Sequence, residues 1–278
     1  MHARMQPTMR VPMHFHGQTP HMTSRTLQGK VAVIAGGGKN LGALIAHQCV
    51  DAGARAVAVH YHSASSQADA DQTVAALIAK GAQAFAFQGD LSVVANNVRL
   101  FDETRQRFGQ VDVAVNTAGV VIKKPILDVT EDDYEKSFAA NSKAAFFFIQ
   151  QAGRTLADEG SIVTIVSSLL AAYTDSYAIY PGSKAPVEHY TRAASKEFGA
   201  RGINVNAIGP GPMDTPFFYG QESQASSAYH ASAAALSKYS KKGLTDIEDI
   251  APIVRFLVTE GWWITGQTIF ANGGYTTR

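Results

Sequence analysis

The chain lacks three features that would each point to a particular class of protein. It has one cysteine, Cys49, so it forms no internal disulfide, and the apolar helical pattern around that residue indicates a buried thiol in a reducing compartment. No apolar run approaches the roughly 18 residues that a membrane-spanning helix needs. The net charge of +1 gives no electrostatic attraction to nucleic acid or to an anionic membrane. We therefore expect a cytoplasmic protein that binds small molecules.

The first 28 residues lack the helical or strand periods of the rest of the chain. They are rich in Met, His, Pro and Thr and have no apolar core of the kind found in secretory signals. His14, His16 and His21 are spread over a segment with Pro and Gly, which favours an unstructured tail over a metal site. We expect a disordered extension over residues 1–28, a single catalytic domain over residues 29–278, and no metal.

From Lys30 onward, short β-branched runs alternate with amphipathic helical stretches. Apolar strands between helices are typical of a parallel sheet covered on both faces, so the sequence predicts an α/β, doubly wound fold with seven mostly parallel strands. Thr130 with Asp133, and Thr245 with Glu248, are expected to form capping boxes. We expect strands at 31–35, 56–60, 84–87, 111–115, 162–166, 203–207 and 268–270, and helices at about 41–53, 66–80, 92–108, 131–157, 177–200 and 246–259.

An irregular stretch at about 212–243 interrupts this alternation. Inserts of this length in compact domains are usually lids or binding loops. Its aromatic residues fit the wall of a pocket for an apolar or ring-bearing carbonyl compound, or equally the packing of the insert or an oligomer interface. These aromatic residues are Phe217, Phe218, Tyr219, Tyr229 and Tyr239, and Trp262 and Trp263 follow.

A glycine-rich turn, Ala35-Gly-Gly-Gly-Lys-Asn-Leu-Gly42, directly follows the first expected strand and opens a helix. A dinucleotide pyrophosphate needs close approach of the backbone and a helix N-terminus pointing at it, and glycines allow both. The position of the turn therefore predicts a dinucleotide site. Its expected contacts here are Gly36, Gly38, Lys39, Asn40, Leu41 and Gly42.

The end of the second expected strand has no carboxylate before Asp69. NAD-selective sites usually place an acid there to bind the ribose hydroxyls, and such an acid would repel a 2′-phosphate. Hydroxyls, imidazole and the Lys39 ammonium favour that phosphate instead, although the polar residues also suit a simple helix cap. We predict NADP(H) in preference to NAD(H), with Tyr61, His62 and Ser63 beside it.

Tyr180 and Lys184 lie four residues apart, so on a helix both side chains project from one face. An ammonium beside a phenol favours the phenolate and brings the tyrosine pKa from about 10 toward the working pH. Pro181 fits the first helical turn, whereas Pro186 frees a carbonyl and is expected to kink the helix.

Taken in order, these motifs resemble the short-chain dehydrogenase/reductase family of the single-domain type, over almost all of residues 29–274. The glycine turn is similar to the family fingerprint, with Asn40 at a usual glycine position; Asn tolerates left-handed backbone angles. The resemblance implies a Rossmann-type fold. It also implies further cofactor contacts at Asp90, Leu91, Asn116, Ala118, Gly119, Pro210, Gly211, Pro212, Met213 and Thr215.

The resemblance further implies a catalytic tetrad of Asn, Ser, Tyr and Lys. Tyr180 and Lys184 match directly and also bind the cofactor, and Asn141 matches the asparagine that holds a water beside the lysine. The family spacing places the serine at Ser167, while a local bulge would exchange it for Ser168.

The expected function is an NADP(H)-dependent oxidoreductase that transfers a hydride between the nicotinamide and a ketone, 3-oxoacyl or secondary alcohol substrate. An NAD-linked alcohol or sugar dehydrogenase is one alternative. A catalytically silent dinucleotide-binding regulatory protein is another, which the complete tetrad disfavours. The family resemblance implies a homotetramer.

Overall fold

A computed structural model describes residues 25–277. His14, His16, His21 and most of the predicted disordered extension lie outside the described residues. Within the predicted extension, Leu27 is only 2% exposed and packs in the main core. The folded domain therefore includes Leu27, because an apolar side chain there completes the core beside the first strand.

The described residues form one seven-stranded sheet with the order β3-β2-β1-β4-β5-β6-β7, and all of its strand pairs are parallel. All seven strands occur where the sequence predicted them, with ends that shift by up to three residues, and the predicted doubly wound fold is confirmed. Their bounds are β1 (Val31–Ala35), β2 (Ala56–Tyr61), β3 (Gln83–Gln88), β4 (Val113–Asn116), β5 (Ser161–Ile165), β6 (Asn204–Pro210) and β7 (Thr268–Ala271).

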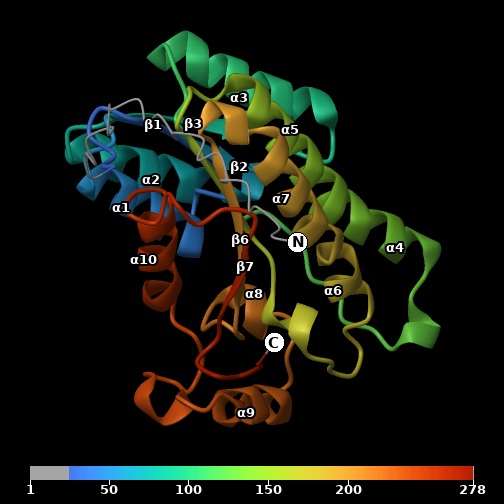
Figure 1. Cartoon of the computed structure of the whole chain (residues 1–278). Coiled ribbons are helices and arrows are strands. Elements are labelled where there is room, and N and C mark those ends of the chain that lie inside the picture. Colours follow the sequence, from blue (N-terminus) through green and yellow to red (C-terminus); the bar gives the residue numbers. More distant parts are fainter. Residues whose placement is uncertain (1–24, 278) are drawn as a thin grey trace, which may run out of the picture.

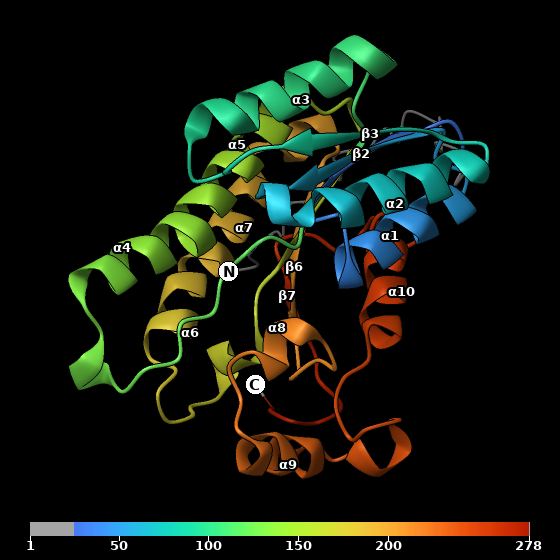
Figure 2. The same ribbon diagram turned by 180° about the vertical axis from the view of Figure 1, so that it is seen from behind.

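Helices cover both faces of the sheet (Figures 1 and 2). Alternate β1 residues point to opposite faces: Ile34 packs in the core with α1, α2 and α10, and Val33 packs in the core with α3, α5 and α7. This two-sided burial explains why the strands are apolar throughout. The helices are α1 (Asn40–Asp51), α2 (Gln67–Ala79), α3 (Val94–Phe108), α5 (Ala144–Thr155), α7 (Pro186–Glu197) and α10 (Ile247–Leu257).

Two predicted long helices are interrupted. The helix expected at 131–157 consists of α4 (Glu131–Phe138), a π-helical turn η3 (Ala139–Lys143) and α5. The helix expected at 177–200 divides into α6 (Ile179–Lys184) and α7 at Ala185, because Pro186 has no amide proton for the helical bond. Ala185 keeps helical angles, so the proline interrupts the hydrogen bonding while the chain continues in nearly the same direction.

One predicted capping box is confirmed and the other shifts by one residue. Thr130 and Asp133 cap α4 reciprocally, and the Asp133 amide donates to the Thr130 hydroxyl at 3.2 Å. At α10 the box joins Asp246 and Asp249 instead of residues 245 and 248. The prediction was wrong there because the Thr245 backbone pairs with Met213, which leaves Asp246 as the first capping residue.

The insert is folded and is closed at its base. It contains α8 (Pro216–Tyr219), α9 (Gln224–Ala233) and a short 3₁₀ turn (Ser237–Tyr239), and these elements lie together at one end of the molecule (Figure 1). The Thr245 amide donates to the Pro212 carbonyl at 2.9 Å, which ties the two ends together. Among the helices of residues 25–277, none is long and apolar enough to cross a membrane.

Candidate active site

The glycine turn after β1 has the backbone geometry that the sequence predicted. Gly36 has φ +72° and Asn40 has φ +49°, so the predicted left-handed asparagine is confirmed. A Cβ placed on Gly42 would lie 2.1 Å from the Gly36 carbonyl oxygen. The turn therefore passes so close to the start of α1 that only glycine fits at residue 42.

A buried histidine that sequence reasoning missed supports this turn. The Gly36 amide donates to His60 Nδ1 at 3.1 Å, so the imidazole proton is on Nε2, which donates to the Gly89 carbonyl at 2.8 Å. Burial lowers the pKa of His60 to about 4, which keeps the ring neutral. The signal was a polar residue within the otherwise apolar run of β2.

The turn opens onto a cleft at the carboxyl ends of β1, β2 and β4. Most predicted cofactor residues line this cleft, and so do several that were not assigned to it, notably His60, Thr117 and Phe217. The predicted residues in its wall are Gly36, Gly38, Lys39, Asn40, Leu41, Gly42, Tyr61, His62, Ala118, Gly119, Tyr180, Lys184, Met213 and Thr215.

Other predicted cofactor residues do not line this cleft. Asn116 instead shapes its floor, because its side-chain oxygen accepts from the Ala118 amide at 3.0 Å. Leu91 is 4% exposed and packs in the core, and the Asp90 carboxylate accepts from the Ser92 amide at 2.8 Å. The remaining ones outside this wall are Ser63 and the segment Pro210, Gly211 and Pro212, which lines the adjacent pocket.

Asn141 lies in the π-helical turn and is almost fully buried. Its side chain exchanges two hydrogen bonds with the backbone of Val120, each 2.9 Å long, and donates to the Ser183 hydroxyl at 3.0 Å. A Cβ on Gly119 would lie 2.7 Å from Asn141 Oδ1 and 2.9 Å from Lys184 Nζ. Glycine at residue 119 thus lets the asparagine and the lysine approach the same point.

Tyr180 and Ser167 are brought together at the boundary of the cleft. Burial raises the pKa of Tyr180 to about 12, and a hydrogen bond with Ser167 acts in the opposite direction. Ser168 is buried beside them, but the hydrogen bond to the tyrosine comes from Ser167. This geometry favours Ser167, the residue that the family spacing indicated.

Lys184 behaves differently from the sequence prediction. Its ammonium donates to the Ile165 carbonyl at 3.0 Å, and burial lowers its pKa to about 8. The expected lowering of the Tyr180 pKa by this ammonium is not found: burial of the phenol is the largest influence on its pKa and raises it, and the opposing influence is the hydrogen bond with Ser167. Tyr180 is therefore a protonated phenol, which suits a proton donor.

The cleft fits a nicotinamide dinucleotide at both ends. At one end the glycine turn exposes its backbone at the N-terminus of α1, as a pyrophosphate requires. At the other end the Thr215 hydroxyl is buried without a hydrogen-bond partner among residues 25–277. A buried hydroxyl without a partner is costly, so this oxygen marks a place where a polar ligand group belongs.

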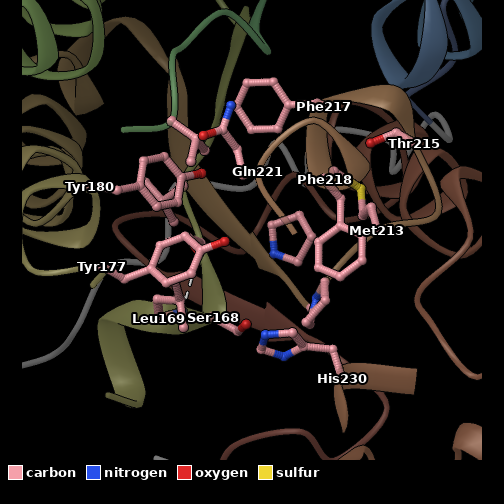
Figure 3. A pocket seen from close by; sticks show the side chains of 16 residues that line it. Ser168, Leu169, Tyr177, Tyr180, Met213, Thr215, Phe217, Phe218, Gln221 and His230 are labelled. Atoms are coloured by element: carbon pink, nitrogen blue, oxygen red, sulfur yellow. Dashed lines mark hydrogen bonds between the residues drawn. The ribbon is translucent and has the colours of Figure 1, made fainter. Parts of the chain in front are cut away.

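A second, mostly apolar pocket meets the cleft at Tyr180, Met213, Thr215 and Phe217 (Figure 3). The Tyr180 and Tyr177 hydroxyls point into it from one side, and Phe218 and Met213 lie opposite (Figure 3). Tyr180 therefore lines both the cofactor cleft and this second pocket.

The aromatic residues of the insert and the two tryptophans after it have different places in the structure: some line the pocket, and others pack on the domain or are exposed on the surface. Phe217 and Phe218 line the pocket. Trp262 packs under the Arg25 guanidinium, which lies 4.3 Å from the ring centre. The remaining four are exposed and outside the pocket: Tyr219, Tyr229, Tyr239 and Trp263. Tyr177, Gln221 and His230 line the pocket and were missed, because nothing in the local sequence directs them there.

A buried carboxylate attaches the insert to the rest of the domain. The Glu222 side chain is fully buried and accepts from Lys123 Nζ at 2.6 Å, from the Tyr177 hydroxyl and from the Ser226 hydroxyl. Burial acts to raise the pKa of Glu222, but these three hydrogen bonds outweigh it and lower the pKa. The first turn of α9 is therefore fixed to the loop after β4 and to a wall of the pocket.

Comparison with known proteins places this site in a family. The family model described as "Enoyl-(Acyl carrier protein) reductase" matches residues 36–276. The short chain dehydrogenase/reductase nsrJ of Aspergillus novofumigatus (strain IBT 16806) is 35% identical, covering 91% of this chain and 97% of its own. The hydroxynaphthalene reductase-like protein Arp2 of Metarhizium majus (strain ARSEF 297) is 36% identical, covering 92% and 98%.

A solved structure is similar in both sequence and shape. It is a putative dehydrogenase from Burkholderia cenocepacia with bound NADP, 61% identical with a TM-score of 0.91, and the match covers 92% of this chain and 97% of that one. The family match extends from the glycine turn over the tyrosine–lysine pair to the closing strand. The chain therefore belongs to the short-chain dehydrogenase/reductase family of NAD(P)-dependent oxidoreductases.

Proposed function

We propose that the protein is an NADP(H)-dependent reductase that converts a ketone to a secondary alcohol. The observation that carries this proposal is the position of Tyr180, a buried and protonated phenol shared by the cofactor cleft and the substrate pocket. A proton donor is needed where these spaces meet, because negative charge develops on the carbonyl oxygen there.

Each residue of the site has a separate role in the proposed reduction. A bound nicotinamide supplies the hydride. Tyr180 gives its proton to the carbonyl oxygen, which is favourable because an alkoxide is more basic than a phenolate, and Ser167 donates a hydrogen bond at the same place. Lys184 carries a proton below a pH of about 8 and holds charge near the phenolate that forms. Asn141 is fixed by Val120 and lies close to the same point beside Gly119 as Lys184. There it would position the lysine and hold a water through which Tyr180 regains its proton.

The pocket supports an uncharged substrate with a ring system. Among the described residues that line it there is no Lys, Arg, Asp or Glu, and the nearby Lys123 is paired with Glu222. The aromatic walls offer flat contact surfaces to a ring. The name of the relative Arp2 also points to a hydroxylated fused-ring compound. We favour a ring-bearing ketone over the 3-oxoacyl substrates that the sequence left open.

The preference for NADP(H) is supported by the charge around the second strand. The residues at the end of β2 include no acid, and Tyr61 and His62 line the cleft there; the nearby Asp90 carboxylate, from the end of β3, lies 4.0 Å from His62 Nδ1. Lys39 Nζ lies 3.2 Å from an Asp69 carboxylate oxygen and 3.5 Å from the Ser66 hydroxyl, and the lysine side chain is half exposed. A 2′-phosphate can therefore reach this ammonium in place of Asp69. The Burkholderia cenocepacia structure contains NADP.

We predict that the protein binds NADPH at least about tenfold more tightly than NADH, and that Lys39→Met removes most of this difference by raising only the Kd of NADPH. Titration of protein fluorescence with each cofactor measures the four constants. Lys80→Met is a matched control, since it breaks a comparable exposed pair with Asp51 (2.7 Å) outside the cleft. Tighter binding of NADH by the unaltered protein would contradict the proposal.

Turnover assays separate this function from its alternatives. A panel of ring ketones with NADPH, and of the matching alcohols with NADP⁺ and NAD⁺, follows the absorbance of the reduced cofactor in both directions. Ketone reduction with NADPH is the expected result. Faster oxidation of alcohols or sugars with NAD⁺ would favour the NAD-linked dehydrogenase, and cofactor binding without any turnover would favour a silent regulatory protein.

Glu222→Gln is expected to raise the KM for the ketone about tenfold while kcat changes less than threefold, because the insert then closes the pocket less firmly. Breaking a buried ion pair costs about 3–5 kcal/mol, and Lys123 keeps only 21% of its side chain exposed. Lys242→Met is the control: it removes a surface pair of the same insert, Lys242 Nζ to Asp214 at 2.9 Å. Equal kinetics for the two variants would contradict this role of Glu222.

We also propose a homotetramer in the cytoplasm. Exposed aromatic side chains on the described surface support self-association, among them Phe146 on α5 (41% exposed) and Trp263 before β7 (82% exposed). Light scattering of the native protein measures the mass of the assembly.

A further inference from the structure

One end of the substrate pocket holds a polar group that the proposed reaction does not use. His230, on α9, is only 4% exposed and lines the pocket together with Tyr177, Tyr180 and Phe218. Figure 3 shows its ring at the end of the pocket away from Phe217, below both tyrosine hydroxyls. The imidazole packs edge-on against Phe218, with the ring centres 5.6 Å apart.

Hydrogen bonding on one side of the ring fixes its proton on the other. The Tyr275 hydroxyl lies 3.0 Å from His230 Nδ1, and Thr174 donates a hydrogen bond to the Tyr275 oxygen. The tyrosine proton is therefore directed to Nδ1, which leaves the imidazole proton on Nε2. Because the ring lines the pocket, this Nε2 proton can reach an oxygen of a bound ligand.

The ring is a neutral donor at the end of a pocket with no charged lining. Burial lowers the pKa of His230, against the attraction of the nearby Glu222 carboxylate, which is itself paired with Lys123. A neutral N–H suits the oxygen of a hydroxyl, ether or carbonyl group more than a carboxylate, which would enter a site without a free cation.

His230 is held in place by contacts before the start of its helix and by a contact at the imidazole ring itself. Glu222, two residues before α9, is fixed by Lys123 and Tyr177, and the far side of the imidazole is fixed by Tyr275 near the chain terminus. A donor fixed in this way loses little freedom when a ligand binds, which is how a pocket gains specificity.

We propose that His230 is a specificity-determining residue that donates a hydrogen bond from Nε2 to an oxygen on the ring system of the substrate, at the end remote from the reacting carbonyl. The substrate is then a neutral, oxygen-substituted aromatic ring ketone, of phenolic type. The inference rests on the proposed function in one respect, that the ketone occupies this pocket with its carbonyl at Tyr180.

Equilibrium binding tests this without requiring turnover. The ligands are 2-naphthol and its 5-, 6- and 7-hydroxy derivatives, titrated by calorimetry into the full chain loaded with NADP⁺. We expect at least one diol to bind about tenfold more tightly than 2-naphthol. His230→Phe should abolish this preference, so that the diols and 2-naphthol bind with similar Kd. Tyr229→Phe, a change in the adjacent, 62% exposed residue of α9, should leave it intact.

Tyr275→Phe provides a second variant that keeps the imidazole. It releases the proton of His230 to either nitrogen, so the diol preference should fall severalfold, even if His230→Phe fails to fold. No diol preference in the unaltered protein, or a full preference in His230→Phe and in Tyr275→Phe, would overturn the inference. Diol preference without reduction of any hydroxylated tetralone would sustain His230 as a recognition residue and refute the proposed reductase function.

Discussion

Tyr180→Phe is expected to lower kcat/KM for ketone reduction by about 10³-fold or more and to leave the Kd of NADPH within about threefold. The phenyl ring keeps the volume of a side chain that is 8% exposed, so the walls of the cleft and the pocket persist. Only the hydroxyl group that is hydrogen-bonded to Ser167 is removed. Loss of the chemical step with retained cofactor binding is the signature of a proton donor, measured by the steady-state absorbance of NADPH and by fluorescence titration.

Tyr177→Phe is the matched control for this variant. Tyr177 lies three residues earlier and lines the same pocket, but its hydroxyl donates to Glu222 and it does not line the cofactor cleft. We expect kcat to fall by less than about tenfold, with the larger change in KM. If the two variants were equally impaired, or if Tyr180→Phe retained activity, the proton donor would have to be another group.

Gly42→Ala is expected to raise the Kd of NADPH by about 100-fold or more and to destabilise the domain by about 1–3 kcal/mol. A Cβ at this position would lie 2.1 Å from the Gly36 carbonyl oxygen and 2.9 Å from the Thr117 hydroxyl. The backbone of the turn must move away, and with it the amides at the N-terminus of α1 that we propose to face the pyrophosphate. Cofactor titration and chemical unfolding measure the two effects.

Gly199→Ala is the control for the second prediction. No atom lies within 4 Å of a Cβ built on Gly199, and its φ lies outside the left-handed region. This variant should bind NADPH normally and unfold at nearly the same denaturant concentration. Unchanged cofactor affinity in Gly42→Ala would show that the turn does not hold the pyrophosphate.

The sequence predicted the elements whose formation depends on local pattern. Apolar runs identified all seven strands. The left-handed backbone angles at Asn40, where the family usually has glycine, were also predicted, because asparagine tolerates these angles better than most residues. The π-helical turn that holds Asn141 was not predicted, since it depends on hydrogen bonds to Val120 and Ser183 from other parts of the chain. Only the fold creates those bonds.

The substrate pocket likewise depends on contacts between residues far apart in the sequence, which local patterns do not predict. Lys123 and Glu222 are 99 residues apart, and His230 and Tyr275 are 45 apart, so no local period connects either pair. The pKa of Tyr180 was also beyond the sequence, which identified the neighbouring ammonium but not the desolvation that dominates. Motifs identified the candidate catalytic residues, whereas the burial that sets their protonation depends on the fold.

The most direct test of the shared phenol is the position of the Tyr180 hydroxyl in a crystal structure of the protein with NADP⁺ and an aromatic alcohol. We predict that the hydroxyl lies about 3 Å from the alcohol oxygen, with that oxygen facing the nicotinamide end of the cleft beside Thr215. An alcohol oxygen bound by other groups, with the Tyr180 hydroxyl more than about 5 Å away, would contradict the account.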